Sequence, residues 1–320
     1  MAATNIDLGQ ALIDSAGSGD LLGVVHLLGQ GADPCSQGSK ALREAASNGH
    51  AECVKLLIPV SNPATADSDA LLAAAKNGHA ECVGLLIPVS EPQAAASRPL
   101  RFSAHNGHAE CVKMLIPVSD PKVRDSGALA AAAEQGHTEC VRLLIPVSDP
   151  KADRSQAIRW AAKNGCAECV RLLIPVSDPK ADASSALRWA AFNGHAECVK
   201  LLILVSDPKA DESSAFRGAA ACGHVECAKL LMSGSGPFLP NEKSLSAVVD
   251  GDSVEILSLM LAAEPLLLSG GVLHSLLSSA ISKLRPNLTI FLSSIVEQES
   301  LAASVSHPEA RLRPAVSRRL

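Results

Sequence analysis

One stretch of the sequence recurs at a fixed spacing and limits the fold more than any other feature. The run from Gly194 to Leu202, GHAECVKLL, has close copies along most of the chain. Its first glycine recurs every 29 residues, at Gly49, Gly78, Gly107, Gly136, Gly165, Gly194 and Gly223. A period of this length indicates stacked supersecondary units that bury their apolar faces against one another. Because each unit contacts only its neighbours, the 320 residues can form one solenoid.

Each copy predicts two short helices, which we name helix A and helix B, joined at the recurrent glycine. In one copy, Leu187, Ala190 and Ala191 follow the i, i+3, i+4 spacing of an inward helical face and so predict helix A. Gly194 ends this helix, because the end of a helix favours a residue that adopts positive φ. Helix B follows at once and turns Cys, Val and Leu side chains toward the core.

Serine and proline recur where the helices begin and end. The serine that starts helix A, Ser184 in this copy, is expected to cap the helix by accepting a backbone N–H. Its counterparts are Ser39, Ser68, Ser97, Ser126, Ser155 and Ser213. A proline such as Pro175 stops helix B. The turn that follows leads to residues 179–182, which we expect to extend helix A backwards.

Two parts of the repeat match a known pattern. Residues 19–34 contain Gly-Asp, Val-Val, Leu-Leu and Gly-Ala-Asp-Pro in order, and residues 41–50 read ALREAASNGH. Together they resemble the ankyrin repeat, over about residues 8 to 268. The resemblance implies an all-α fold, an ankyrin-like α-solenoid of stacked helix-turn-helix repeats. Ankyrin repeats usually have about 33 residues, so the shorter period here predicts short or absent β-hairpin fingers.

The copies divide the chain into four parts. Residues 1–35 are predicted to form an N-terminal capping ankyrin-like repeat, and residues 36–236 seven tandem 29-residue repeats. Residues 237–300 keep the pattern loosely and are expected to be degenerate capping repeats, because the end of a solenoid needs a polar outer face. Residues 301–320 are predicted to be a disordered basic tail.

Composition argues against nucleic acid and membrane partners. Aromatic residues make up 2% of the chain and the formal net charge is −5, so base-stacking platforms and a phosphate-binding surface are not expected. No apolar run approaches the roughly 18 residues that span a bilayer. The N-terminus lacks the basic segment of a signal peptide. We expect a monomer that binds a protein partner.

Seven of the ten cysteines follow the repeat period. Equivalent residues on packed helices lie about 8–10 Å apart. A disulfide needs Cα atoms within about 7 Å, so these thiols should not pair. They are predicted to be small buried residues in a reducing compartment. This favours the cytoplasm; the nucleus, or a host cytosol after export, are the alternatives.

The remaining chemical motifs are explained by the repeat. His-x-x-Cys recurs, but neighbouring copies are too far apart to share a metal ion, so each His is expected to bond between adjacent loops. Cys166 and Cys169 form a Cys-x-x-Cys, which we interpret as a coincidence in which Cys166 replaces the usual histidine. One glutamate per repeat does not make an active site. No enzyme, cofactor or metal is predicted.

Function in a repeat scaffold is expected at surface positions that differ between copies. Five residues before the recurrent glycine lie Glu44, Ala73, Phe102, Ala131, Trp160, Trp189 and Gly218. Two residues before it lie Ser47, Lys76, His105, Glu134, Lys163, Phe192 and Ala221. The resemblance places Lys163 and Phe192 in a concave groove lined by helix A. It places Trp160 and Trp189 at a framework position, where burial in the core is the first interpretation and a partner contact is the alternative.

An arginine row precedes the tryptophan position. Arg159, Arg188 and Arg217 could bind partner carboxylates bidentately, and Arg43 and Arg101 occupy the same place. The alternative is a solvated face neutralised by three acids, Asp153, Asp182 and Asp211. The predicted partner-binding residues are Arg159, Arg188, Arg217, Lys163, Trp189 and Phe192.

The predicted function is a non-enzymatic protein–protein interaction scaffold that binds its partner through the concave helix A surface. One alternative is a targeting adaptor or secreted effector whose activity depends on a recruited partner or on the C-terminal segment. A third is a purely structural array without a binding site.

Overall fold

The computed structural model describes residues 2–234, 241–264 and 270–306, without the side chains of residues 2–7, 65–68, 94–96, 270 and 302–306. Within these residues every regular element is helical, and twenty α-helices follow one another in pairs. The chain divides into two units, Met1–Ala186 and Leu187–Leu320. The predicted all-α solenoid of helix pairs is confirmed.

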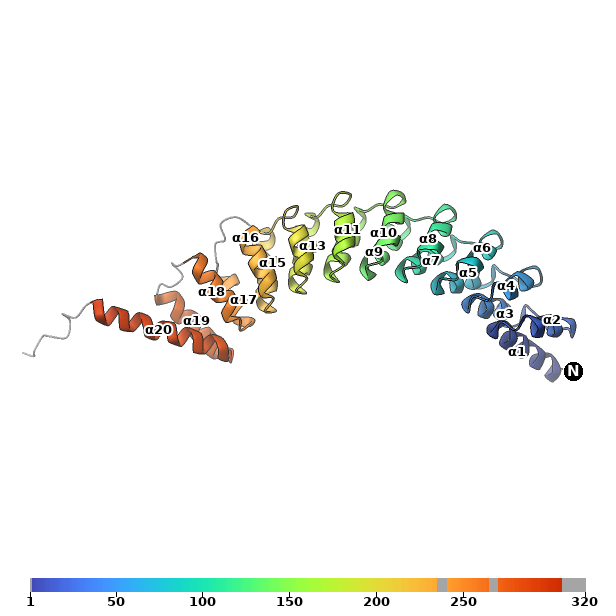
Figure 1. Ribbon diagram of the computed structural model, residues 1–320, viewed down its shortest axis with the longest axis horizontal. Coiled ribbons are helices and arrows are strands. Elements are labelled where there is room, and N and C mark those ends of the chain that lie inside the picture. The colour runs from blue at the N-terminus through green and yellow to red at the C-terminus, as the bar shows by residue number, and fades with distance from the viewer. Residues whose placement is uncertain (1, 235–240, 265–269, 307–320) are drawn as a thin grey trace, which may run out of the picture. The chain divides into compact units, whose positions relative to one another are not determined.

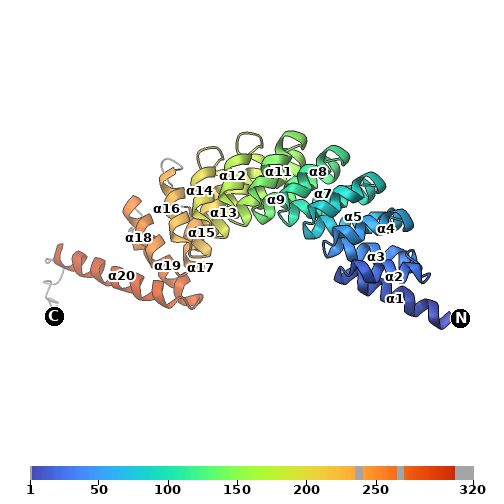
Figure 2. The same cartoon turned by 45° about the vertical axis from the view of Figure 1, so that its right-hand side comes forward.

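The first unit contains six complete helix pairs. Its A helices are α1 (Ala2–Ser18), α3 (Ser36–Ser47), α5 (Thr65–Asn77), α7 (Ala94–His105), α9 (Val123–Gln135) and α11 (Ala152–Lys163). Its B helices are α2 (Leu21–Gly29), α4 (Ala51–Leu57), α6 (Ala80–Leu86), α8 (Ala109–Leu115), α10 (Thr138–Leu144) and α12 (Ala167–Leu173). Each A helix contacts the next A helix, and each B helix the next B helix, so two layers of helices run through the unit (Figures 1 and 2).

The second unit continues the same arrangement. Helix α13 (Ala181–Phe192) begins in the first unit and ends in the second. The helices that follow are α14 (Ala196–Leu202), α15 (Ala210–Ala221), α16 (Val225–Gly234), α17 (Glu242–Asp250), α18 (Val254–Ala263), α19 (Gly270–Ser282) and α20 (Pro286–Ser306). The last two pairs occupy the stretch expected to hold degenerate repeats. Helix α20 continues six residues into the segment 301–320, and residues 307–320 of the expected tail lie outside the described residues.

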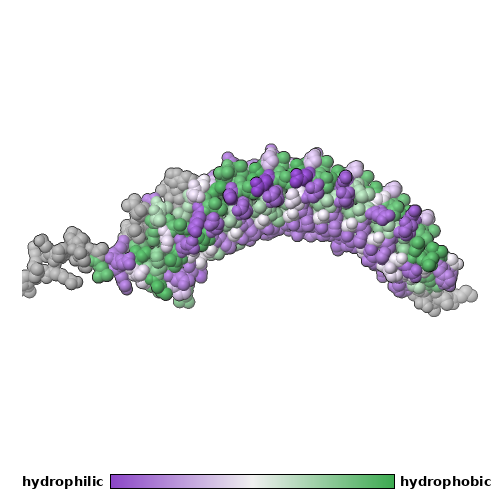
Figure 3. Space-filling view, in the orientation of Figure 1, coloured by the Kyte–Doolittle hydropathy of each residue, from purple (hydrophilic) through white to green (hydrophobic). Residues whose placement is uncertain are grey.

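The core is built from one set of positions in every repeat. In α7 and α8, Leu100, Val112 and Leu115 are fully buried, and Ala104 lets the two layers approach closely. The cysteine of helix B, Cys111 here, is also buried, as the sequence predicted. Hydrophilic side chains cover the lower edge of the first unit in Figure 3, below α7, α9 and α11.

Helix B ends one residue earlier than its proline alone would require. In four repeats the Ile-Pro-Val sequence after helix B forms a short 3₁₀ helix, with the proline near its start; these are η1 (Ile58–Val60), η2 (Ile87–Val89), η3 (Ile116–Val118) and η4 (Ile145–Val147). Proline tolerates this position because the N–H that it lacks would have no helical acceptor there.

The recurrent glycine needs both its φ angle and its lack of a side chain. Gly49 has φ of +79°, and a Cβ added to it would lie 2.5 Å from Nδ1 of His79 in the next repeat. The Nε2 atom of His79 lies 2.9 Å from the carbonyl oxygen of Ser47, so the imidazole lies directly against the preceding joint. The same histidine contact recurs at His50 and His108. The prediction that each histidine bonds between adjacent loops is therefore confirmed for His50, His79 and His108.

The serine before helix A does not cap its own helix. Ser126 is buried, and its hydroxyl accepts a hydrogen bond from the backbone N–H of Asp149, 2.8 Å away in the turn that leads to the next repeat. Ser39, Ser97 and Ser155 accept from the equivalent N–H, at 2.8–3.1 Å for the set. The predicted N-cap is thus wrong for these four serines, which join successive repeats instead; the side chain of Ser68 lies outside the described residues.

The first residues of α13 turn with the opposite hand to the right-handed extension of helix A that the sequence predicts. Residues 182–184 have φ of 51°, 52° and 57°, which forms a single left-handed turn. Residues 153–155 and 211–213 adopt the same conformation. The prediction that residues 179–182 extend helix A backwards is therefore wrong. The left-handed turn reverses the chain in few residues, and this explains how the repeat dispenses with a β-hairpin finger.

Candidate functional site

The six predicted partner-binding residues fall on both units. Arg159 and Lys163 lie on α11 in the first unit. The other four lie in the second unit, on α13 and α15: Arg188, Trp189, Phe192 and Arg217.

Trp189 and Phe192 form an exposed aromatic pair near the end of α13. Their side chains are 40% and 48% exposed, and their rings meet edge to face with centroids 6.1 Å apart. The interpretation of Trp189 as a core residue is therefore wrong. The inward face of α13 is occupied by Leu187, Ala190 and Ala191, all fully buried. Residue 189 lies beside that face, where an alanine could be buried but an indole projects outward.

A glycine on the neighbouring helix leaves room for this pair. A Cβ placed on Gly218, in α15, would lie 3.4 Å from Cβ of Phe192. Helix α15 therefore approaches Phe192 closely without covering its ring. We call Trp189 and Phe192 the aromatic patch.

Lys163 and Trp160 occupy the two corresponding positions of α11. The ammonium of Lys163 lies 4.6 Å from the centroid of the Trp160 ring, a cation–π contact. Trp160 is half-buried, so its interpretation as a core residue holds only in part.

The arginine row is paired with acids of its own chain. Nη2 of Arg159 lies 3.2 Å from the carboxylate of Asp153, and Nη1 lies 3.6 Å from Asp182. Arg188 reaches Asp211 at 3.2 Å. Arg217 reaches Asp211 at 4.0 Å and Glu212 at 3.5 Å. The alternative interpretation, a face neutralised by Asp153, Asp182 and Asp211, therefore describes the geometry found.

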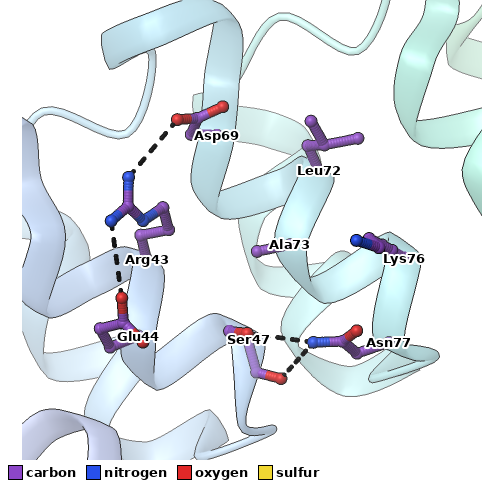
Figure 4. A pocket seen from close by; sticks show the side chains of 8 residues that line it. All are labelled: Arg43, Glu44, Ser47, Asp69, Leu72, Ala73, Lys76 and Asn77. Carbon is purple, nitrogen blue, oxygen red and sulfur yellow. Dashed lines mark hydrogen bonds and ion pairs between the residues drawn. The ribbon is translucent and has the colours of Figure 1, made fainter.

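Arg43 shows the same neutralisation at the other end of the first unit. It lies between Glu44 and Asp69, at 3.5 and 3.6 Å, in a shallow pocket between α3 and α5 (Figure 4). In the same pocket the amide of Asn77 donates to the carbonyl oxygen of Ser47 at 2.7 Å. Two groups of polar side chains in this pocket thus pair among themselves: Arg43 with Glu44 and Asp69, and Asn77 with Ser47.

Arg101 belongs to the arginine row but is not among the six predicted partner-binding residues. It makes no ion pair or hydrogen bond with the described residues, and its Nε atom is buried. A comparison of the copies at single positions would have found it, because Arg124 stands where later repeats have aspartate.

Cys82, Cys111, Cys140 and Cys166 are unsuited to redox chemistry. All ten are free. Burial, followed by the charge of the adjacent glutamate, raises the pKa of Cys82, Cys111 and Cys140 to about 11. Burial also raises the pKa of Cys166, whereas a redox thiol needs a lowered pKa. The coincidence interpretation of the Cys-x-x-Cys fits these values.

Among the described residues, no group of three or more His, Cys, Asp or Glu side chains is arranged to hold a metal ion. No helix of that part of the chain is long and apolar enough to cross a membrane.

The repeats match those of a known protein family. A family model described as ankyrin repeats (3 copies) matches residues 12–96, 71–156, 100–183 and 158–241. The chain belongs to the ankyrin repeat family. Ankyrin repeats are generally protein-interaction modules and are typically non-enzymatic.

A crystal structure of the human ASB11 ankyrin repeat domain is similar to this ankyrin repeat protein. The TM-score is 0.46 and the sequence identity 23%, over 55% of this chain and 95% of that chain. No curated protein sequence matches.

Proposed function

We propose that this ankyrin repeat protein is a non-enzymatic scaffold that binds a protein partner through the exposed side of its A helices, with the aromatic patch as the apolar anchor. The observation that carries the proposal is the exposure of Trp189 and Phe192 on one helix. The whole chain has only seven aromatic residues, two Trp and five Phe, so two neighbouring exposed rings are a concentrated apolar surface. Large aromatic side chains dominate the energetics of protein interfaces.

The helix that carries the patch is held rigidly. Leu187, Ala190 and Ala191 are fully buried beneath it, and the rings contact each other before any partner arrives. Binding therefore requires little ordering of the backbone, which lowers the entropic cost of association.

Lys163 and Trp160 extend the proposal to the preceding repeat. Their cation–π contact keeps a positive charge beside an apolar ring at the same two repeat positions. A partner with an acidic group next to an apolar side chain would suit this combination. Arg159, Arg188 and Arg217 act differently: they pair with acids of the chain and support the surface.

The experiment starts from a partner identified by proximity labelling and then purified. Binding is measured by titration calorimetry for the natural protein and for the double variant Trp189→Ala, Phe192→Ala. We expect the variant to bind at least about tenfold more weakly, because removal of a central aromatic anchor typically costs more than 1 kcal/mol. The control is Leu204→Ala in the same unit, which removes an apolar side chain that is 84% exposed but lies in a turn away from the patch.

The control should bind within about twofold of the natural protein, since isolated exposed apolar residues contribute little. Undiminished binding by the double variant would refute the placement of the site. An equal loss in the control would show that the effect is not specific to the patch.

A further inference from the structure

Three members of the arginine row, Arg159, Arg188 and Arg217, pair with acids at two recurrent positions of the repeat. One acid lies 23 residues after the arginine, as Asp182 does for Arg159. The other lies six residues before it, as Asp153 does for Arg159. In the second unit, Asp211 serves Arg188 as the later acid and Arg217 as the earlier one.

Arg101 has neither acid. The residue 23 positions after it is Arg124, and the residue six positions before it is Ala95. Arg98 stands one helical turn earlier on the same helix. Arg124 therefore stands where the later repeats place a carboxylate, and Arg98 adds another cation on the helix that carries Arg101.

Arg101 and Arg124 approach each other at a glycine of α9. A Cβ placed on Gly127 would lie 3.5 Å from Cβ of Arg124 and 3.6 Å from Cδ of Arg101, so the two side chains are neighbours there. Burial lowers the pKa of Arg101, and the charges of Arg124 and Arg98 lower it further, as expected for three close cations. We call Arg98, Arg101 and Arg124 the arginine cluster.

The cluster has unused hydrogen-bonding capacity. Arg101 contacts the ring of Phe102 at 4.8 Å, but among the described residues it has no acceptor for its N–H groups, and its Nε atom is buried. A buried donor without an acceptor is unfavourable, and neighbouring cations repel one another. An external carboxylate would relieve both.

We propose that the arginine cluster binds the carboxylates of an acidic segment of a protein partner, which take the place of the aspartates that other repeats supply. Guanidinium groups match carboxylates in geometry and charge. Arg159 already contacts two carboxylates of its own chain, one through each terminal nitrogen. This site lies on α7 and on the left-handed turn at the start of α9, on other helices than the aromatic patch and in the other unit. The proposal for the arginine cluster can therefore be refuted while the proposed function holds, and the proposed function can be refuted while the proposal for the cluster holds.

An acidic peptide fits the surroundings better than a nucleic acid. Nucleic acid binding needs a broad basic stripe that tracks the phosphates. Here the cations are confined to one repeat interval, exposed Asp125 stands directly beside Arg124, and the chain carries a net charge of −5. A long phosphate backbone would meet these negative charges, whereas a short acidic segment need not.

The test uses the full chain and a fluorescein-labelled oligoglutamate peptide, followed by fluorescence anisotropy at low ionic strength. Arg124→Asp installs the aspartate found at positions 153, 182 and 211, so the variant has a carboxylate of its own beside Arg101. We expect its affinity for the peptide to fall at least about tenfold, since a charge is reversed and a competing acid added. The matched control, Arg171→Asp, makes the same charge change at an exposed arginine of α12 and should change affinity less than about twofold.

Each other outcome overturns the proposal. Equal loss in both variants would mean that only net charge matters. Equal binding of an oligoglutamine peptide would exclude carboxylate recognition. Tighter binding of a single-stranded oligonucleotide than of oligoglutamate would make the cluster a phosphate site instead.

Discussion

The joint between helix A and helix B makes a prediction whose size follows from the geometry. Gly49 and Gly223 both have positive φ, 79° and 73°, but their surroundings differ. A Cβ on Gly49 would lie 2.5 Å from the imidazole of His79, whereas a Cβ on Gly223 would meet nothing closer than the carbonyl oxygen of Gly251 at 3.9 Å. Gly223→Ala therefore measures the backbone cost alone, and Gly49→Ala measures that cost plus the clash.

The two costs can be separated. An alanine held in the left-handed region costs about 1 kcal/mol, so Gly223→Ala should destabilise by about that amount. In Gly49→Ala the imidazole must also move and lose its 2.9 Å contact with the carbonyl oxygen of Ser47, which costs about 1 kcal/mol for the hydrogen bond and about 1 kcal/mol or more for repacking. We expect a total of about 3 kcal/mol.

The assay is urea unfolding followed by circular dichroism, with midpoints compared at equal m values. The double variant Gly49→Ala, His79→Ala removes the ring that the new methyl group would strike. Because His79→Ala alone loses only the hydrogen bond, the double variant should be less destabilised than the sum of the single variants, by about 1 kcal/mol or more. Strict additivity, or equal destabilisation by Gly49→Ala and Gly223→Ala, would refute the close approach of the two repeats.

Three further predictions concern stability. Ser126→Ala leaves the N–H of Asp149 without its acceptor and should cost about 1–2 kcal/mol in the free energy of unfolding, measured by urea titration; a change within about 0.3 kcal/mol would contradict the serine link. Arg124→Asp should raise stability by about 0.5–1 kcal/mol through an ion pair with Arg101 and the tolerance of aspartate for positive φ, and a lower thermal midpoint would contradict this. Burial raises the pKa of five thiols to about 11 from the 9.0 of an unperturbed thiol; they are Cys82, Cys111, Cys140, Cys169 and Cys227. The stability that these neutral thiols contribute is therefore complete below pH 9 and is lost as the pH rises toward 11, by up to about 1.4 kcal/mol per pH unit for each thiol. Constant unfolding midpoints between pH 9 and 11 would contradict the raised pKa values.

The helix pairs and their core were predictable because they repeat. Leu187, Ala190 and Ala191 mark the same inward face in every copy, and a pattern that recurs every 29 residues leaves little ambiguity in period or register. The glycine joint was predictable for the same reason, since only positive φ explains a glycine there in every copy.

The left-handed turn was not predictable from local preferences. Asp182, Ala183 and Ser184 read as an ordinary helix start with a serine cap, and nothing in their propensities signals three consecutive residues at positive φ. The turn is compatible with the serine's contact to the following repeat, which is a tertiary interaction across 23 residues. Local sequence rules cannot register such a contact.

The position of the candidate surface was predictable from the sequence, but the exposure and the ion pairing of its side chains were not. Variation between copies pointed to Trp189 and Phe192, while their exposure depended on the space left between neighbouring A helices. The arginine row was found as a pattern, but its pairing required three-dimensional distances, because the acids lie six and 23 residues away in the chain. The difference at Arg124 could be read from the copies, but its consequence for Arg101 required the distances of the paired arginines.

The most direct test of the central claim follows the fluorescence of Trp189. Trp160→Phe leaves Trp189 as the single tryptophan, and its side chain is 40% exposed in the free protein. On titration with the purified partner, we predict a blue shift of the emission and reduced quenching by acrylamide, with a midpoint equal to the calorimetric Kd, because the indole becomes buried in the interface. Saturating binding with unchanged emission and unchanged quenching would contradict the claim that this protein recognises its partner through the aromatic patch.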